Sequence, residues 1–230
     1  KKDRKISIGF LRPGTRNSYV DIDRCPLISE EMNTRLTILR DEVQQKELVT
    51  PHKKGGTLLL REHLDGISTN PKDVIREKVG DVTFSFPAGE FFQNNPHILE
   101  SFTQYVSGKA KDAGAKYLVD AYCGSGLFCL TAAKDFEKAI GIEVSEHSVQ
   151  YAVKNAEANQ LDNASFIVGD AASIFEHIDF PGSDSAVIID PPRKGSNENF
   201  LSQLVAFSPR VIVYVSCNPA TQMRDLQTLL

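Results

Sequence analysis

The strongest constraint on the fold of this chain is a regular alternation of apolar runs with helical patterns, which starts at residue 117 and continues to the end of the sequence. Each apolar run has the length and composition of a buried strand, and the stretches between the runs have helical spacing. Alternation of this kind is typical of a parallel sheet with helices on both faces. We expect strands at residues 117–121, 139–143, 165–168, 186–190 and 210–215, and helices at residues 127–135, 146–159, 171–177 and 199–207.

The first half of the sequence is organised differently, and its pattern changes between residues 108 and 116. We therefore expect a smaller α+β region over residues 1–107, which leads into the ligand site, and an α/β domain over residues 108–230. A chain of 230 residues with 41% hydrophobic composition is long enough to bury a core in both. In the first region we expect extended segments at residues 6–10, 57–62 and 82–86, and helices at residues 29–49 and 95–111.

The cysteines and the charge balance exclude several classes of protein. The four cysteines are widely spread, with neither a C-x-x-C pair nor a histidine at ligand spacing, so we expect neither a zinc site nor an iron–sulfur cluster. Reduced thiols indicate an intracellular setting, and no apolar run reaches the roughly 18 residues of a membrane span. Because the net charge is −4, contacts with nucleic-acid phosphate must come from local patches such as Lys53-Lys54 and Arg193-Lys194.

A glycine turn follows the first expected strand of the α/β domain. Gly124 and Gly126 allow the backbone to turn tightly and to approach a ligand closely. Glu143 ends the next strand about 20 residues later, where a carboxylate can accept hydrogen bonds from the two ribose hydroxyls of an adenosine. A dinucleotide would also fit this pair of features, but Cys129 occupies the place of the third glycine of that motif. Asp170, after the third strand, is placed either to meet an adenine amino group or to cap a helix.

Two further strand ends carry chemical groups. Asp190 is followed by two prolines, which fix the backbone and hold its carboxylate at the edge of the sheet. Cys217 follows the last apolar run, and a helical stretch begins near Thr221. A helix N-terminus favours the reactive thiolate form of a nearby cysteine. A cysteine in this place could instead be a small buried hydrophobic residue that caps the strand.

Taken together, the order and spacing of these motifs resemble one known family. The sequences FFQNN at residues 91–95, DAYCGSGLF at 120–128, GIE at 141–143, DPPRKG at 190–195 and SCNP at 216–219 are similar to those of the S-adenosylmethionine-dependent RNA 5-methyluridine methyltransferases. The resemblance is strongest over residues 80–230 and is closest to the eukaryotic transfer-RNA enzymes that form ribothymidine in the T-loop. It implies a Rossmann-like class I methyltransferase sheet, S-adenosylmethionine as cofactor, a tRNA substrate, Cys217 as nucleophile, and a cofactor site lined by Gln93, Tyr122, Glu143, Asp170 and Asp190.

The chemistry of such a reaction suits these residue types. Carbon 5 of uracil is a poor nucleophile, and a thiolate that adds to carbon 6 activates it by leaving an enolate. Asp190 could then hold the polar edge of the ring, and a base must remove the proton from carbon 5. The resemblance implies that this base is a glutamate downstream of Cys217. Since the sequence stops at Leu230, we expect the glutamate and the last strands of the sheet to be missing from these 230 residues, and the chain to be inactive if it is a fragment.

Two other functions remain open at this point. Enzymes that methylate exocyclic amino groups of nucleic acids also carry D-P-P, although an aromatic residue usually follows there, where this chain has Arg193. Such enzymes need no thiol. A non-catalytic RNA-binding or RNA-folding module that keeps the fold is the second alternative.

Overall fold

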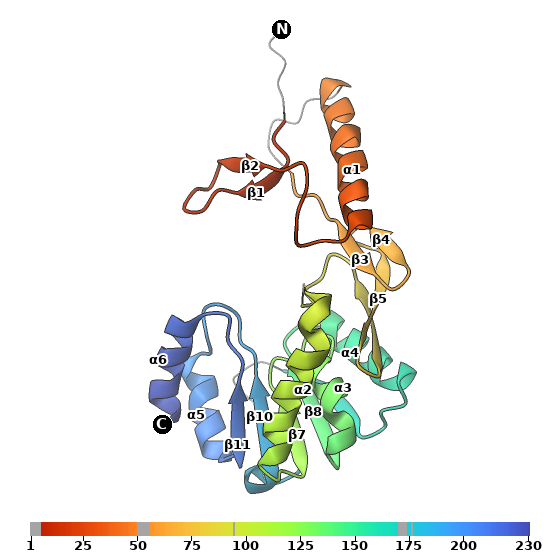
Figure 1. The fold of residues 1–230 in the computed structure, drawn as a ribbon. Helices are drawn as coiled ribbons and strands as arrows, with labels where there is room; N and C mark the ends of the chain where they lie inside the picture. The colour runs from red at the N-terminus through yellow and green to blue at the C-terminus, as the bar shows by residue number, and fades with distance from the viewer. Residues whose placement is uncertain (1–5, 50–55, 94, 170–173, 176) are drawn as a thin grey trace. The chain divides into compact units, whose positions relative to one another are not determined.

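The computed structural model describes residues 6–49, 56–93, 95–169, 174–175 and 177–230. The chain forms two compact units, which are Lys1–Ile75 with Pro87–Gly89, and Arg76–Phe86 with Glu90–Leu230 (Figure 1). The boundary expected between residues 107 and 108 lies inside helix α2 (Pro96–Asp112). The chain passes between the units at residues 75–76, 86–87 and 89–90 instead.

The first unit is a small α+β element. A hairpin of β1 (Gly9–Leu11) and β2 (Tyr19–Asp21) precedes helix α1 (Glu30–Val49), and β3 (Arg61–His63) pairs with β4 (Gly66–Ser68). The helix expected at residues 29–49 is thus confirmed.

Arg40 joins the helix of this unit to its hairpin. Its buried guanidinium donates to the Asp21 carboxylate at 3.0 Å and to the Ile8 carbonyl at 2.9 Å. A buried cation with such partners keeps its charge, and burial without them would be costly. The pKa of Arg40 is raised by its hydrogen bond to Asp21.

The second unit contains a parallel sheet of five strands in the order β11-β10-β7-β8-β9. Its strands are β7 (Tyr117–Asp120), β8 (Lys138–Glu143), β9 (Ala164–Val168), β10 (Ser185–Ile189) and β11 (Val211–Tyr214). The Rossmann-like sheet expected from the sequence is therefore confirmed. A separate two-stranded sheet is formed by β5 (Val74–Val79) and β6 (Val82–Pro87).

Helices cover both faces of the five-stranded sheet. All residues of β10 are buried, and because successive side chains of a strand point to opposite faces, both faces must be covered. Helix α2 packs against β10 and β11, and α4 (Glu146–Ala158) packs against β8 and β9 (Figure 1). The remaining helices are α3 (Leu127–Ala132), α5 (Glu198–Phe207) and α6 (Pro219–Leu229), with 3-10 turns at Ala133–Asp135 and Gly182–Asp184.

Two expected helices differ in detail. Helix α6 begins at Pro219 and not near Thr221, because the Asn218 side chain caps it by accepting from the backbone N–H of Ala220 at 3.2 Å. Most of the helix expected at residues 171–177 lies outside the described residues.

No helix in the described part of the chain is both long and apolar enough to cross a membrane.

The strand order determines where a ligand can bind. From β7 the chain continues to β8 and β9 on one side, and it returns to place β10 and β11 on the other side. In open α/β sheets, ligands bind at the carboxyl ends of the strands where the order reverses. The carboxyl ends of β7, β8 and β10 therefore define the candidate site.

Candidate active site

The turn after β7 depends on glycine. Gly124 has φ +52° and Gly126 has φ +96°, which are left-handed conformations that other residues rarely adopt. A Cβ at Gly126 would lie 2.9 Å from Leu130 Cδ1, whereas a Cβ at Gly124 would meet nothing within 4 Å. The predicted turn thus leaves open space beside Gly124, where a ligand can approach the backbone.

Glu143 lies beside this turn. Its carboxylate accepts a hydrogen bond from the backbone N–H of Gly124 at 3.2 Å and another from that of Ser145 at 3.0 Å. The side chain is half-buried at the carboxyl end of β8. The fold therefore brings together the acid and the glycine turn that the sequence singled out 19 residues apart.

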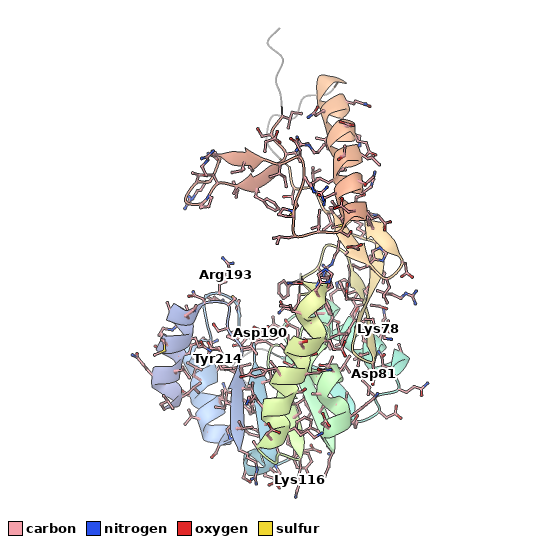
Figure 2. All side chains as sticks on the ribbon, viewed as in Figure 1. Lys78, Asp81, Lys116, Asp190, Arg193 and Tyr214 are labelled. Carbon is pink, nitrogen blue, oxygen red and sulfur yellow. The ribbon has the colours of Figure 1, made fainter. Side chains whose placement is uncertain are left out.

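Asp190 and Gln93 also meet at this edge of the sheet. The Gln93 amide donates from Nε2 to Asp190 Oδ2 at 3.3 Å, although the two residues lie 97 positions apart. Asp190 follows β10 directly, and burial raises the pKa of its carboxyl from 3.8 to about 6. Its place at the strand end is visible in Figure 2.

A third carboxyl group, on Asp120, was assigned no role from the sequence. Asp120 is completely buried at the end of β7, and its Oδ2 accepts from the backbone N–H of Cys129 at 3.0 Å. Its Oδ1 makes no hydrogen bond with any described residue. Burial raises the pKa of Asp120 to about 7, and the charges of Asp190 and Glu143 add to this effect. The sequence signal that could have indicated a role is its position as the first residue of the DAYCGSGLF motif at residues 120–128.

Tyr122 lies between the glycine turn and the loop after β10. Its hydroxyl donates to Ser196 Oγ at 3.2 Å, and its ring meets Phe200 edge-on, with centroids 5.4 Å apart. Burial raises the pKa of this half-buried phenol. Ser196 was not among the residues predicted for the site.

Cys217 is the exposed cysteine of this unit. It lies between the end of β11 and the cap of α6. Because its side chain is exposed, the alternative that it is a small buried hydrophobic residue is wrong. Cys123 and Cys129 are buried, and burial raises the pKa of both thiols well above the usual range. Of these three, Cys217 alone is placed to react with a large substrate.

The loop after Asp190 is joined to the segment after Cys217. The Arg193 carbonyl accepts from Asn218 Nδ2 at 3.0 Å and from Thr221 Oγ1 at 3.2 Å. The side chains of Arg193 and Lys194 are exposed, and Arg193 projects away from the strands (Figure 2).

Asp170, Lys53 and Lys54 lie outside the described residues. The described residues contain no group of three or more acidic, histidine or cysteine side chains that could hold a metal ion.

Comparison with known proteins identifies relatives of the chain. A family model described as tRNA (Uracil-5-)-methyltransferase matches residues 30–230. The tRNA (uracil(54)-C(5))-methyltransferase of Schizosaccharomyces pombe is 45% identical over an alignment of 237 positions, gaps included, and the match covers 98% of this chain and 44% of that protein. The protein of the same name from Saccharomyces cerevisiae is 40% identical over an alignment of 263 positions, gaps included, and the match covers 94% of this chain and 41% of that protein. The chain thus spans less than half the length of these curated relatives.

A solved structure supports the same relationship. The crystal structure of Pyrococcus abyssi tRNA (uracil-54, C5)-methyltransferase in complex with S-adenosyl-L-homocysteine superimposes with a TM-score of 0.73 and 26% sequence identity. The match covers 92% of this chain and 64% of that one.

Proposed function

This chain belongs to the tRNA (uracil-5-)-methyltransferase family, and we propose that its protein transfers a methyl group from S-adenosylmethionine to carbon 5 of a uridine in tRNA. The names of the relatives specify uracil 54, and we propose the same T-loop position for this protein. The observation that carries the proposal is the placement of Cys217. Its exposed thiol follows β11, which pairs with β10 in the sheet. Asn218, next to Cys217, is hydrogen-bonded to the loop that begins with Asp190 at the end of β10.

The residues at the strand ends fit S-adenosylmethionine. Bound there, this cofactor supplies an electrophilic methyl group on a sulfonium cation. The carboxyl groups of Asp120, Glu143 and Asp190 gather at one edge of the sheet. A cation bound at this edge favours their ionised forms, so the sulfonium and the carboxylates suit each other. We assign Glu143 to the ribose hydroxyls, the Gly124–Gly126 turn to close backbone approach, and Gln93, Tyr122 and Asp190 to the remaining wall. Asp170 stays a prediction.

The catalytic role falls to Cys217 and Asp190. The Cys217 thiolate forms a bond to carbon 6 of the uracil, and the electron pair of the 5,6 double bond moves toward carbon 5 and oxygen 4. Asp190 holds the polar edge of the ring while this charge develops. Carbon 5 would then take the methyl group as the bond between that methyl group and the sulfonium sulfur breaks, with its electron pair left on the sulfur. A base removes the proton from carbon 5, and the electrons of that carbon–hydrogen bond restore the 5,6 double bond and release Sγ of Cys217 as a thiolate. The base is the downstream glutamate that the family resemblance implies.

The tRNA must present a single extruded base. A uracil inside a stacked loop cannot reach a thiol at a strand end, so the nucleotide has to leave its stack. We propose that Arg193 and Lys194 contact nearby phosphates. Their side chains are exposed, and their loop is hydrogen-bonded to Asn218, the residue that follows Cys217.

The exposure of Cys217 favours this reaction over the two alternatives, since methylation of an amino group and passive RNA binding need no accessible thiol. The test is methyl transfer from labelled cofactor to an unmodified tRNA transcript, followed by mass spectrometry of the nucleosides. We expect 5-methyluridine with the intact natural protein and none with Cys217→Ser. A methylated exocyclic amine would support the first alternative, and tRNA binding without any transfer would support the second.

A further inference from the structure

One buried carboxylate in the second unit has no role in the proposed reaction. Asp225 lies on α6, and its exposed fraction is 0%, although the helix around it is largely exposed. Removing a carboxylate from water is costly unless hydrogen bonds replace its hydration. The partners of Asp225 therefore show what this burial achieves.

The two oxygens of Asp225 bind different elements. Oδ2 accepts from the backbone N–H of Ser196 at 2.8 Å and from the Tyr214 hydroxyl at 2.6 Å. Oδ1 accepts from Arg224 Nε at 2.9 Å and from Arg224 Nη2 at 2.6 Å. Burial acts to raise the pKa of Asp225, but the hydrogen bonds from Tyr214, Ser196 and Arg224 bring it below the usual value.

Two of these partners belong to the segments that carry the reacting groups. Ser196 lies near the end of the loop that starts at Asp190, and Tyr214 is the last residue of β11, shortly before Cys217. Arg224 extends the connection, because its Nη2 also donates to the carbonyls of Lys194 at 3.0 Å and Ser196 at 3.1 Å.

The loop approaches Asp225 closely. Gly195 has φ +77°, and a Cβ there would lie 2.5 Å from Arg224 Nη2 and 2.7 Å from Asp225 Oδ2. The backbone of the loop thus lies directly against the carboxylate. The network also reaches the proposed cofactor wall, since Tyr122 donates to the hydroxyl of the same Ser196 that donates its N–H to Asp225.

We propose that Asp225 is a positioning residue for methyl transfer, which fixes the loop of Asp190 relative to the strand end that bears Cys217. This inference rests on the proposed function, because it assigns the two segments to one reaction. Asp225 touches neither uracil nor cofactor in this role. It acts through Ser196 and Tyr214, and the distance between the Asp190 carboxylate and the Cys217 thiol depends on it.

Substitutions of Asp225 should reduce kcat and leave binding nearly intact. A misplacement of reacting groups by about 1 Å costs on the order of 100-fold in rate, so we expect a decrease of about that size in Asp225→Ala. In Asp225→Asn the amide oxygen can still accept from Ser196 and Tyr214, whereas the hydrogen bonds from Arg224 are lost. The kcat of this variant should lie between that of the natural protein and that of Asp225→Ala. The Kd for S-adenosylmethionine and the KM for tRNA should change much less than kcat, because Glu143 and the glycine turn are held together outside this network. A small change in both is expected, since Tyr122 bonds to Ser196 and since Arg193 and Lys194 lie in the same loop.

Hydrogen exchange gives a readout that does not depend on activity. In Asp225→Ala the amides of residues 193–197 and 216–218 should exchange faster, while those of β7 and β10 stay protected. Tyr214→Phe removes a single hydrogen-bond donor to Asp225 and replaces Asp225→Ala as the test variant if Asp225→Ala fails to fold. It should also lower kcat with KM retained.

The matched control is Asp184→Ala. Asp184 also pairs with basic side chains, Lys116 and Arg210, but at the amino ends of the strands, where Figure 2 shows Lys116 far from Asp190. This variant should keep the kcat of the natural protein. If the natural protein methylates tRNA and folded Asp225→Ala has the same kcat, or if the change lies in KM alone, the positioning role is overturned and the proposed function stands. If the natural protein does not methylate tRNA, both fall.

Discussion

The Glu143 carboxylate, at the end of β8, accepts a hydrogen bond from the backbone N–H of Gly124, in the turn after β7. Parallel strands place their carboxyl ends at one edge of a sheet, so two motifs that are separate in the sequence become adjacent. A carboxylate held in this way is oriented before any ligand binds. Little ordering then has to be done when a ribose reaches it.

Glu143→Ala should weaken the binding of S-adenosylmethionine by about 1 to 3 kcal/mol, because hydrogen bonds to a charged group are removed. Calorimetry with the folded variant measures this directly. Glu157→Ala, which removes an exposed carboxylate from α4, is the matched control and should bind as the natural protein does. Unchanged affinity in Glu143→Ala would remove this residue from the cofactor site.

The two glycines of the turn should respond differently to alanine. Both have positive φ, but only at Gly126 would a Cβ press on a neighbour, 2.9 Å from Leu130 Cδ1. Gly126→Ala should lose about 1 to 3 kcal/mol of unfolding free energy more than Gly124→Ala does, as for an overpacked core. Gly124→Ala should instead reduce cofactor affinity, because its methyl group fills the open space beside the turn. Urea unfolding and calorimetry test the pair, and equal effects on both properties would contradict this assignment.

The stability of the protein should depend on pH through Asp120. Burial raises the pKa of this carboxyl from 3.8 to about 7. Between these pH values the folded state holds a proton that the unfolded state has lost, so this group makes stability fall as pH rises from about 4 to 7. The slope from one such group is at most about 1.4 kcal/mol per pH unit. In Asp120→Asn the fall should be smaller.

Urea unfolding at several pH values in this window measures the effect of Asp120→Asn. Asp162→Asn, which changes an exposed aspartate, controls for the change of net charge. If the natural protein and Asp120→Asn lose stability in parallel, another group causes the pH dependence.

Interactions with phosphate should be visible in the salt dependence of tRNA binding. The charges proposed for this role are Lys53, Lys54, Arg193 and Lys194, since the net charge of −4 leaves binding to local patches. Removal of each side chain that binds a phosphate should decrease the slope of log affinity against log salt by roughly 0.7 to 0.9. Lys116→Ala, at the amino end of β7, should leave the slope unchanged. If removal of all four charges has no effect on affinity or slope, the RNA docks elsewhere.

The parallel sheet and most of the site could be predicted because their signals are local. Runs rich in β-branched and apolar residues, such as 186–190, correspond to strands that are buried on both faces, and glycines or acids directly follow them. The three-residue strand β2 was missed because its residues are exposed and show no apolar alternation. Helix α6 begins two residues earlier than expected because the Asn218 side chain caps it, a role that its place before a proline could have indicated.

The positioning network could not be predicted from the sequence. Asp225 and Ser196 lie 29 positions apart, and nothing in the spacing of a loop serine and a helical aspartate indicates that they bond. Beside Arg224, Asp225 looks like one half of an ordinary surface ion pair. Only the packing of α6 against the loop after β10 reveals that the carboxylate is buried.

The covalent role of Cys217 is tested most directly with a tRNA that carries 5-fluorouridine at the target position. The thiolate should add to carbon 6 and the methyl group should transfer. Carbon 5 then carries fluorine in place of the proton that the base must remove, so the bond between carbon 6 and Sγ persists. With the intact natural protein and S-adenosylmethionine, we expect a protein–RNA adduct on a denaturing gel, mapped by mass spectrometry to Cys217. Cys217→Ser should form no adduct and no 5-methyluridine. Methylation of carbon 5 at the normal rate by folded Cys217→Ser would contradict the mechanism.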